Sequence, residues 1–232
     1  MYQFHYFKIL VISAILTYGF NNALGSQILS WDQTEITRTL GPETTEASAS
    51  FFVYNSGDDL IIIDRAESNS FACKTILKDK VIYPQSRAQI DVRFDADKKE
   101  GIYHNKIKIY ITQETESIST LNFIVEIPEY IECQPKMHSW DATRPDTVVK
   151  SAIKIDPRFI KKIDTIEYDQ QQYDVLLLAS ELDPYYYELH IKPLNNKRPF
   201  SSNITIKASS LNGAEIIERL YLFNSQSIDK NL

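Results

Sequence analysis

The chain has 232 residues, of which 43% are hydrophobic and 24% charged, a balance typical of a folded protein of one or two domains. Its net charge of −6 argues against a nucleic-acid partner, because phosphate recognition needs a concentrated basic face. The four histidines and the two cysteines, Cys73 and Cys133, show no metal-ligand spacing, so we expect no cofactor and no metal.

The N-terminus has the pattern of a secretory signal peptide over residues 1–25. Lys8 ends a short n-region, an apolar stretch runs from Ile9 to Phe20, and Ala23-Leu24-Gly25 is a small-x-small cleavage site. The apolar stretch is shorter than the ~20 residues of a comfortable membrane-spanning helix. We expect a periplasmic or secreted protein with no membrane insertion after cleavage; an uncleaved anchor is the open alternative.

The residues after the signal read as short strands separated by turn residues. In the first half we expect strands at 28–31, 46–55, 60–67, 71–77, 88–95, 103–112 and 121–127. The clearest is 103–112, where Ile107 and Ile109 alternate with Lys106 and Lys108. Within 46–55, Phe51 and Val53 share one face.

The second half repeats this organisation, with strands expected at 130–133, 148–155, 163–168, 173–179, 186–192, 203–208 and 216–223. A helix over 157–168 is a weak rival, because that segment contains several β-branched residues. The segments 88–94 and 187–193 resemble each other, as do 103–109 and 200–206, which indicates a repeat about one sandwich domain long. The sequence therefore predicts an all-β protein: two immunoglobulin-like antiparallel β-sandwich domains in tandem, residues 26–128 and 129–232, after the signal peptide.

Several segments resemble a known family. Ser50-Phe51-Phe52-Val53-Tyr54-Asn55-Ser56-Gly57-Asp58, Tyr83-Pro84, Ile90-Asp91-Val92-Arg93-Phe94 and the Gly101 to Ile109 strand are similar to the bacterial secreted proteins of domain-of-unknown-function family 1573. The resemblance implies an immunoglobulin-like sandwich akin to Hydin and major-sperm-protein modules. It covers most of residues 28–140 and, more loosely, the rest, and the family lends no enzymatic role.

The chain departs from the family pattern at two places. Members commonly carry Ser-Cys-Gly-Cys-Thr after the third strand, where this chain has Ser70-Phe71-Ala72-Cys73-Lys74. One thiol cannot close a local disulfide, so the resemblance implies no paired-cysteine chemistry here. A Cys73–Cys133 disulfide and two free buried thiols both stay open. The glycine that usually follows the proline is replaced by Gln85-Ser86.

The sequence contains no Gly-x-Ser-x-Gly elbow, His-Glu-x-x-His helix or phosphate-binding loop, and we expect no enzymatic activity. Aromatic residues are the most suggestive feature, because they dominate the energetics of interfaces. Phe52 and Tyr54 are expected to face away from Phe51 and Val53, and Tyr186 lies in a run of three tyrosines. These three are the candidate binding residues, for a protein or a glycan; packing between the domains is the alternative.

The leading interpretation is a secreted or periplasmic, non-enzymatic binding or scaffolding module of the cell envelope, using sandwich edges or loop tips. One alternative is a periplasmic chaperone-like protein handling envelope subunits, which a basic inter-domain cleft would favour and an acidic one would contradict. A second alternative is a thiol- or metal-linked envelope protein that uses Cys73.

Overall fold

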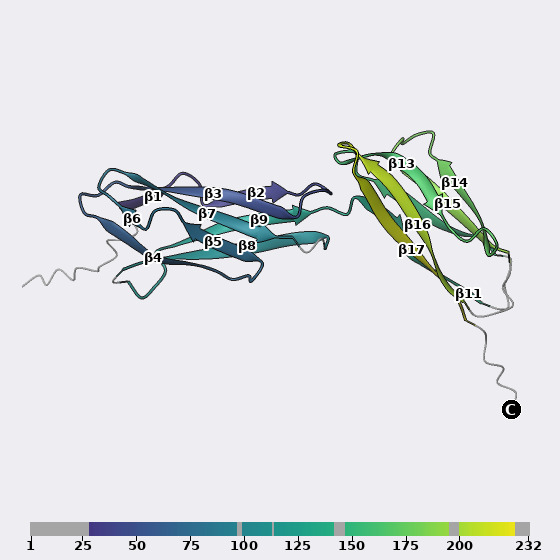
Figure 1. The fold of residues 1–232 in the computed structure, drawn as a ribbon, viewed down its shortest axis with the longest axis horizontal. Helices are drawn as coiled ribbons and strands as arrows, with labels where there is room; N and C mark the ends of the chain where they lie inside the picture. Colours follow the sequence, from purple (N-terminus) through teal and green to yellow (C-terminus); the bar gives the residue numbers. More distant parts are fainter. Residues whose placement is uncertain (1–27, 97–98, 113, 142–146, 195–199, 226–232) are drawn as a thin grey trace, which may run out of the picture.

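The computed structural model describes residues 28–96, 99–112, 114–141, 147–194 and 200–225, so the predicted signal peptide lies outside the described residues. In this part of the chain the regular elements are strands, β1 to β17, arranged in four sheets. The sheets pair into two sandwiches that follow one another along the molecule (Figure 1). The predicted all-β, immunoglobulin-like class is confirmed. No described helix has the length and apolar character needed to cross a membrane.

The first sandwich contains nine strands. They are β1 (Leu29–Trp31), β2 (Glu35–Thr39), β3 (Glu46–Asn55), β4 (Ile61–Ser68), β5 (Cys73–Leu77), β6 (Val81–Ile82), β7 (Arg87–Asp95), β8 (Gly101–Ile111) and β9 (Ser119–Ile127). One sheet has the order β1-β3-β7-β5 and the other β2-β9-β8-β4-β6.

The second sandwich contains eight strands. They are β10 (Ile131–Gln134), β11 (Met137–Asp141), β12 (Val149–Ile155), β13 (Ile160–Glu167), β14 (Tyr173–Ala179), β15 (Tyr186–Pro193), β16 (Phe200–Ser210) and β17 (Glu215–Ser225). The sheet orders are β10-β12-β15-β14 and β11-β17-β16-β13, which repeat those of the first sandwich strand for strand, except that β6 has no counterpart.

Three strands were missed by the sequence interpretation: the two-residue β6, and β2 and β11. We consider the longer two, β2 and β11. Each pairs in parallel with the last strand of its sandwich, β2 with β9 and β11 with β17, so the sandwiches are not purely antiparallel. In β2 only Ile36 is buried, and one apolar residue among polar ones gives no period-2 signal. The strand expected at 163–168 is found as Ile160–Glu167, in preference to the rival helix. The strand expected at 71–77 begins only at Cys73, and Phe71 is fully exposed in a turn.

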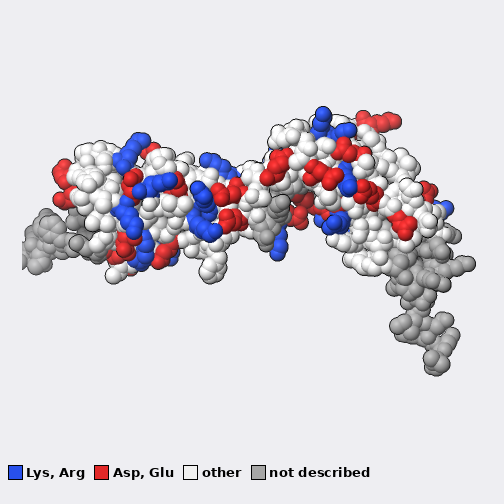
Figure 2. Space-filling model, viewed as in Figure 1, with Lys and Arg blue, Asp and Glu red and all other residues white. Residues whose placement is uncertain are grey.

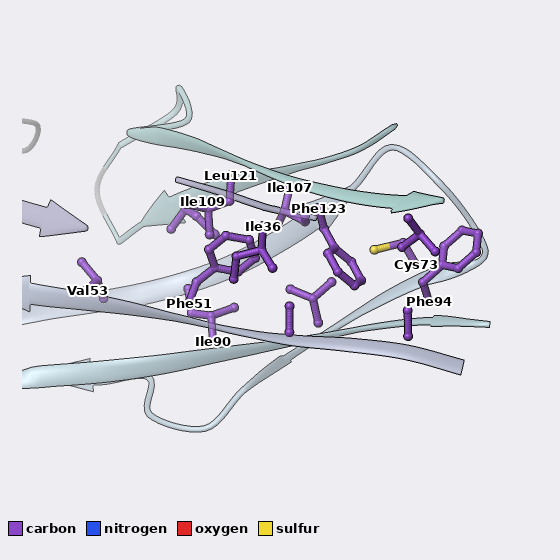
Figure 3. Close-up of a cluster of buried hydrophobic side chains, with 14 of the residues drawn as sticks. Ile36, Phe51, Val53, Cys73, Ile90, Phe94, Ile107, Ile109, Leu121 and Phe123 are labelled. Carbon is purple, nitrogen blue, oxygen red and sulfur yellow. The ribbon is translucent and has the colours of Figure 1, made fainter. Parts of the chain in front are cut away.

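Each sandwich encloses its own core, built from the inward side chains of both sheets. In the first, Phe51 and Ile90 from one sheet meet Ile107 and Phe123 from the other, and all four are fully buried (Figure 3). The second core has the same plan, with Ile153, Leu189, Ile191, Ile204, Ile206, Leu220 and Leu222 fully buried. The alternation of side chains along each strand therefore fixes which residues remain on the outer faces, where binding can occur.

Candidate functional site

Phe52 and Tyr54 lie on the outer face of β3, as the alternation predicts. Phe52 is 37% exposed and Tyr54 half-buried, whereas Phe51 and Val53 are fully buried. The face around them is largely polar: Gln89 Nε2 donates to Asp91 Oδ1 at 2.6 Å. The structure therefore places one exposed aromatic ring within a hydrogen-bonded surface rather than an aromatic patch.

The hydroxyl of Tyr54 has a structural partner. It donates to Gln85 Oε1 at 2.6 Å, and Gln85 Nε2 donates in turn to the carbonyl of Ser56 at 2.9 Å. Gln85 has a φ of 56°, in the left-handed region that favours glycine. This is the position where the family usually has glycine. Hydrogen bonding of the Gln85 side chain compensates for the unfavourable backbone conformation, so Tyr54 serves the turn before β7.

Tyr186 lies in the second sandwich, away from Phe52 and Tyr54, on the outer face of the β12-β15-β14 sheet. Leu176 and Leu178, on the neighbouring strand β14, are 54% and 41% exposed. In the register of the pair, Leu178 lies opposite Glu188 and Leu176 opposite His190, whose Nε2 is 2.9 Å from Glu188 Oε2. The three predicted residues therefore do not form one site, but Tyr186 borders an exposed leucine pair that the sequence interpretation missed.

Strand β14 is also the free edge of its sheet, since it pairs only with β15. The amide of Ser180 donates to the carbonyl of Tyr186, which makes 180 and 186 a hydrogen-bonded pair. Because such pairs alternate in antiparallel sheets, the backbone groups of Val175, Leu177 and Ala179 point away from β15. We call these three residues the β14 edge. It offers donors and acceptors every second residue, with the two exposed leucines between them.

The equivalent strand of the first sandwich, β5, is also an edge strand that pairs only with β7, but a side chain links it to the other sheet. Residues 73–77 of β5 pair with β7. Residues 173–177 of β14, one hundred positions later, pair with β15 in the same way. Thr75 Oγ1 donates to the carbonyl of Ala66 in β4 at 2.6 Å and ties the edges of the two sheets together. The position equivalent to Thr75 is Val175, which has no hydroxyl to donate.

A buried asparagine adds a second element of closure to the first sandwich. Asn55 is fully buried, and its Nδ2 donates to the carbonyls of Asp59 at 2.8 Å, Ile82 at 3.2 Å and Tyr83 at 3.3 Å. These bonds hold β6 against the edge of β4. At the equivalent end of β12 the chain has Ile155, which cannot make them, and no β6-like strand is described there. Strand β13, the counterpart of β4, therefore has no such strand along its outer edge in the described part of the chain.

The two cysteines are free thiols, each buried in a different core. Cys73 projects between the two sheets at one end of the first core (Figure 3). Burial raises the pKa of the Cys73 thiol, and burial raises the pKa of Cys133 to about 12. Thiols held protonated are poor nucleophiles and metal ligands. Among the described residues, no three His, Cys, Asp or Glu side chains are grouped to hold a metal ion.

One serine–histidine pair lies inside the second sandwich. His138 Nε2 is 2.7 Å from Ser151 Oγ, which donates to the carbonyl of Pro135 at 2.8 Å. Ser151 is fully buried and His138 is 9% exposed. Because the hydroxyl donates to a carbonyl and has no access to solvent, this pair is a satisfied core hydrogen bond rather than a nucleophile and base.

Contacts between the sandwiches hold the junction. The hydroxyl of Tyr130 donates to the carbonyl of Leu40 at 3.1 Å. The carboxylate of Glu43 accepts from Ser210 Oγ at 2.5 Å and from Asn212 Nδ2 at 3.3 Å. These two hydrogen bonds lower the pKa of Glu43. The loop between β2 and β3 is thus attached to the β16–β17 turn.

Hollows border the junction on more than one side. Two of them, lined by residues that include Ile127, Tyr130, Glu215 and Glu218, contain no lysine or arginine among their lining residues. A third includes Lys154 and Arg158, but Arg158 Nη2 is 2.6 Å from Asp156 Oδ2. The basic cleft that would favour the chaperone alternative is therefore not found in these hollows.

Comparisons with solved structures give distant likenesses. The ASH/PapD-like domain 7 of human CEP192 is 12% identical, over 52% of this chain and 96% of that chain, with a TM-score of 0.34. The E. coli chaperone DraB is 10% identical, over 83% and 94%, with a TM-score of 0.32. The Vibrio cholerae VesB protease is 14% identical, over 46% of this chain and 35% of that chain, with a TM-score of 0.33. No functional conclusion follows from likenesses this distant, and no curated protein matches.

The family comparison is more specific. The model of the family described as "Protein of unknown function (DUF1573)" matches residues 29–127, from the first residue of β1 to the last residue of β9. The match spans all strands of the first sandwich and none of the second. The resemblance inferred from the sequence is confirmed for the first sandwich, which is similar to the DUF1573 family over residues 29–127.

Proposed function

We propose that the protein is a secreted or periplasmic, non-enzymatic binding module, and that it takes up an extended segment of an envelope or extracellular partner protein at the β14 edge. The observation that carries this proposal is a difference between two equivalent edge strands: the Thr75 hydroxyl ties β5 to β4, whereas β14 has Val175 at that position and cannot make this bond. The signal-peptide pattern of residues 1–25 supports the location.

The chemistry of the β14 edge selects a polypeptide over a glycan. Backbone amides and carbonyls two residues apart match the hydrogen-bonding pattern of another strand. Leu176 and Leu178 would contact the partner's side chains on the outer face, and the half-buried Val175 and Leu177 would contact those on the inner face. The preferred segment therefore has apolar side chains on both faces. An unprotected apolar edge of this kind otherwise favours aggregation.

A peptide display library of extended segments tests the proposal. We expect selected peptides to lose about tenfold or more in affinity when Leu176→Lys and Leu178→Lys are combined, because charges on the edge oppose strand addition. The matched control is Ile76→Lys on β5, 39% exposed at the position equivalent to Leu176, which should leave the affinity unchanged.

Hydrogen exchange provides a second measurement that does not depend on these variants. Bound peptide should slow amide exchange at Val175, Leu177 and Ala179, and leave Leu77 on β5 unaffected. The proposal is wrong if protection from exchange appears at another edge. It is also wrong if the Leu176→Lys, Leu178→Lys double variant and the Ile76→Lys control bind the peptide equally well. Binding of glycans that is lost with Phe52→Ser and Tyr54→Ser would support the aromatic face of β3 instead.

A further inference from the structure

A continuous groove runs along one side of the junction. Two hollows of about 360 and 160 Å³ share Ile127, Tyr130, Ile216 and Ile217. We call the surface around these four residues the junction groove. Ile217 is 47% exposed on the outer face of β17, so the floor of the groove keeps apolar surface in contact with solvent. Apolar surface in a recess is the part of a surface that gains most from a partner.

The rim of the junction groove is acidic. Four glutamates line it, namely Glu100, Glu129, Glu215 and Glu218, with no lysine or arginine among the lining residues. Figure 2 shows acidic side chains on both sides of the junction. Glu218 is paired with Lys136 at 2.9 Å and Glu215 is 3.9 Å from Lys207. Among the described residues, no ion pair within 4.0 Å is found for Glu100 or Glu129.

The negative charge at Glu129 is incompletely balanced. Burial raises the pKa of Glu129, and the nearby carboxylates of Glu100, Glu132 and Glu218 raise it further, against the opposing effect of Lys136. On the other side of the linker the charges are matched, since Arg158 binds Asp156 through several hydrogen bonds. The groove thus combines an apolar floor with an acidic rim on which Glu100 and Glu129 have no ion pair within 4.0 Å among the described residues.

We propose that the junction groove binds a short segment of a partner protein in which a lysine or arginine is flanked by apolar side chains. The cation supplies the counter-charge for Glu100 and Glu129, and the apolar side chains cover Ile217. An organic cation fits better than a metal ion, because the described residues contain no group of three metal-ligating side chains. This inference is independent of the β14 edge.

The walls of the groove come from both sandwiches, Pro42 and Thr44 from the first and β17 from the second. Pro42 and Thr44 flank Glu43, whose carboxylate accepts from the β16–β17 turn. A ligand in the groove therefore contacts both sides of the junction and favours the docked arrangement over a separated one.

A titration with two small peptides, followed by amide chemical shifts, tests the inference. Ac-Leu-Lys-Leu-NH2 should shift the amides of Ile127, Tyr130 and Ile217, and Ac-Leu-Glu-Leu-NH2 should not. Combining Glu100→Gln with Glu129→Gln should weaken the lysine peptide about fivefold to tenfold, because two partly exposed charge pairs are lost. The matched control is Glu181→Gln, which removes an exposed charge between β14 and β15, outside both hollows.

The salt dependence of peptide binding provides a second measurement. Raising the salt concentration from 0.05 to about 0.5 M should weaken the lysine peptide in the unaltered protein, which tests the charge without any variant. The inference is overturned if the lysine peptide produces no shifts at millimolar concentration, if the glutamate peptide binds equally well, or if Glu181→Gln has the same effect as the double variant.

Discussion

The two sandwiches have the same strand order but differ at the edges of both sheets. In the first, Asn55 holds β6 over β4, and Thr75 ties β5 to the carbonyl of Ala66. In the second, the equivalent positions are Ile155 and Val175, and β14 is left with unpaired backbone groups. At both positions the second sandwich has an aliphatic side chain where the first has a polar one, and its described residues include neither a β6-like strand nor the hydrogen bond that Thr75 makes.

The closure of the first sandwich can be removed with one substitution. Asn55→Ile introduces the residue found at the equivalent end of β12 and should destabilise the first sandwich by about 3 kcal/mol, because buried carbonyls lose their donor. The chain has one tryptophan per sandwich, Trp31 and Trp140, so urea unfolding of a Trp140→Phe background reports on the first sandwich alone.

Asn122→Ala, a half-buried position on β9, is the control for Asn55 and should change stability by less than about 0.5 kcal/mol. Loss of β6 should also appear as faster exchange of the Ile63 amide, which donates to the carbonyl of Lys80 at 2.7 Å. An Asn55→Ile variant with unaltered stability would show that Asn55 does not hold the edge closed.

Acid should lower the stability of the second sandwich in a way that the first does not share, because the buried His138 belongs to the second. Burial lowers the pKa of His138, so the folded state favours the neutral ring. Below the unfolded pKa of about 6.5, protonation stabilises the unfolded chain, and the second sandwich loses stability as the pH falls further. A Trp31→Phe background reports this loss. His138→Gln, which keeps an N–H donor for Ser151, should remove that pH dependence.

The strand pattern was readable from sequence because most strands have one buried and one exposed face. Phe51 and Val53 against Phe52 and Tyr54 show this alternation, and the structure gives the same orientation. The sequence interpretation did not identify strand β11, because β11 pairs in parallel with a strand distant in sequence and because Met137 at its start is exposed although apolar. The alternation of apolar and polar residues indicates which face of a strand is buried, but it does not indicate which other strand pairs with it.

The β14 edge could not be derived from its own residues. The run Val175 to Ala179 was recognisable as a strand, and its apolar residues on both faces were a usable signal. Whether β14 is tied to the opposite sheet depends on a hydroxyl at 175, and whether β13 is covered depends on an asparagine at 155; the chain has valine and isoleucine at these positions. The repeat of about one hundred residues held this information, since aligning the halves places Thr75 beside Val175 and Asn55 beside Ile155.

A smaller change tests the tie between β5 and β4. Thr75→Val introduces the residue found at 175 and removes the hydrogen bond to the carbonyl of Ala66, at an expected cost of about 1 kcal/mol. The Leu77 amide, which faces the same edge, should exchange faster. Thr120→Val, on the outer face of β9, is the comparison. Equal exchange at Leu77 in both variants would show that the Thr75 hydroxyl does not close the edge.

The smallest effect is expected at Gln85, where the chain departs from its family. Gln85→Gly removes the cost of a left-handed φ at a non-glycine residue, a gain of about 1 kcal/mol. It also removes the acceptor for the Tyr54 hydroxyl and the donor to the carbonyl of Ser56, a loss of similar size. The net change in the free energy of unfolding should stay within about 1 kcal/mol.

Adding Tyr54→Phe separates the two effects: in the Gln85→Gly background it should cost nothing further, whereas in the unaltered chain it should cost about 1 kcal/mol. Equal costs in both backgrounds would show that the Tyr54 hydroxyl does not support the turn. Tyr54 would then again be a candidate binding residue on the outer face of β3.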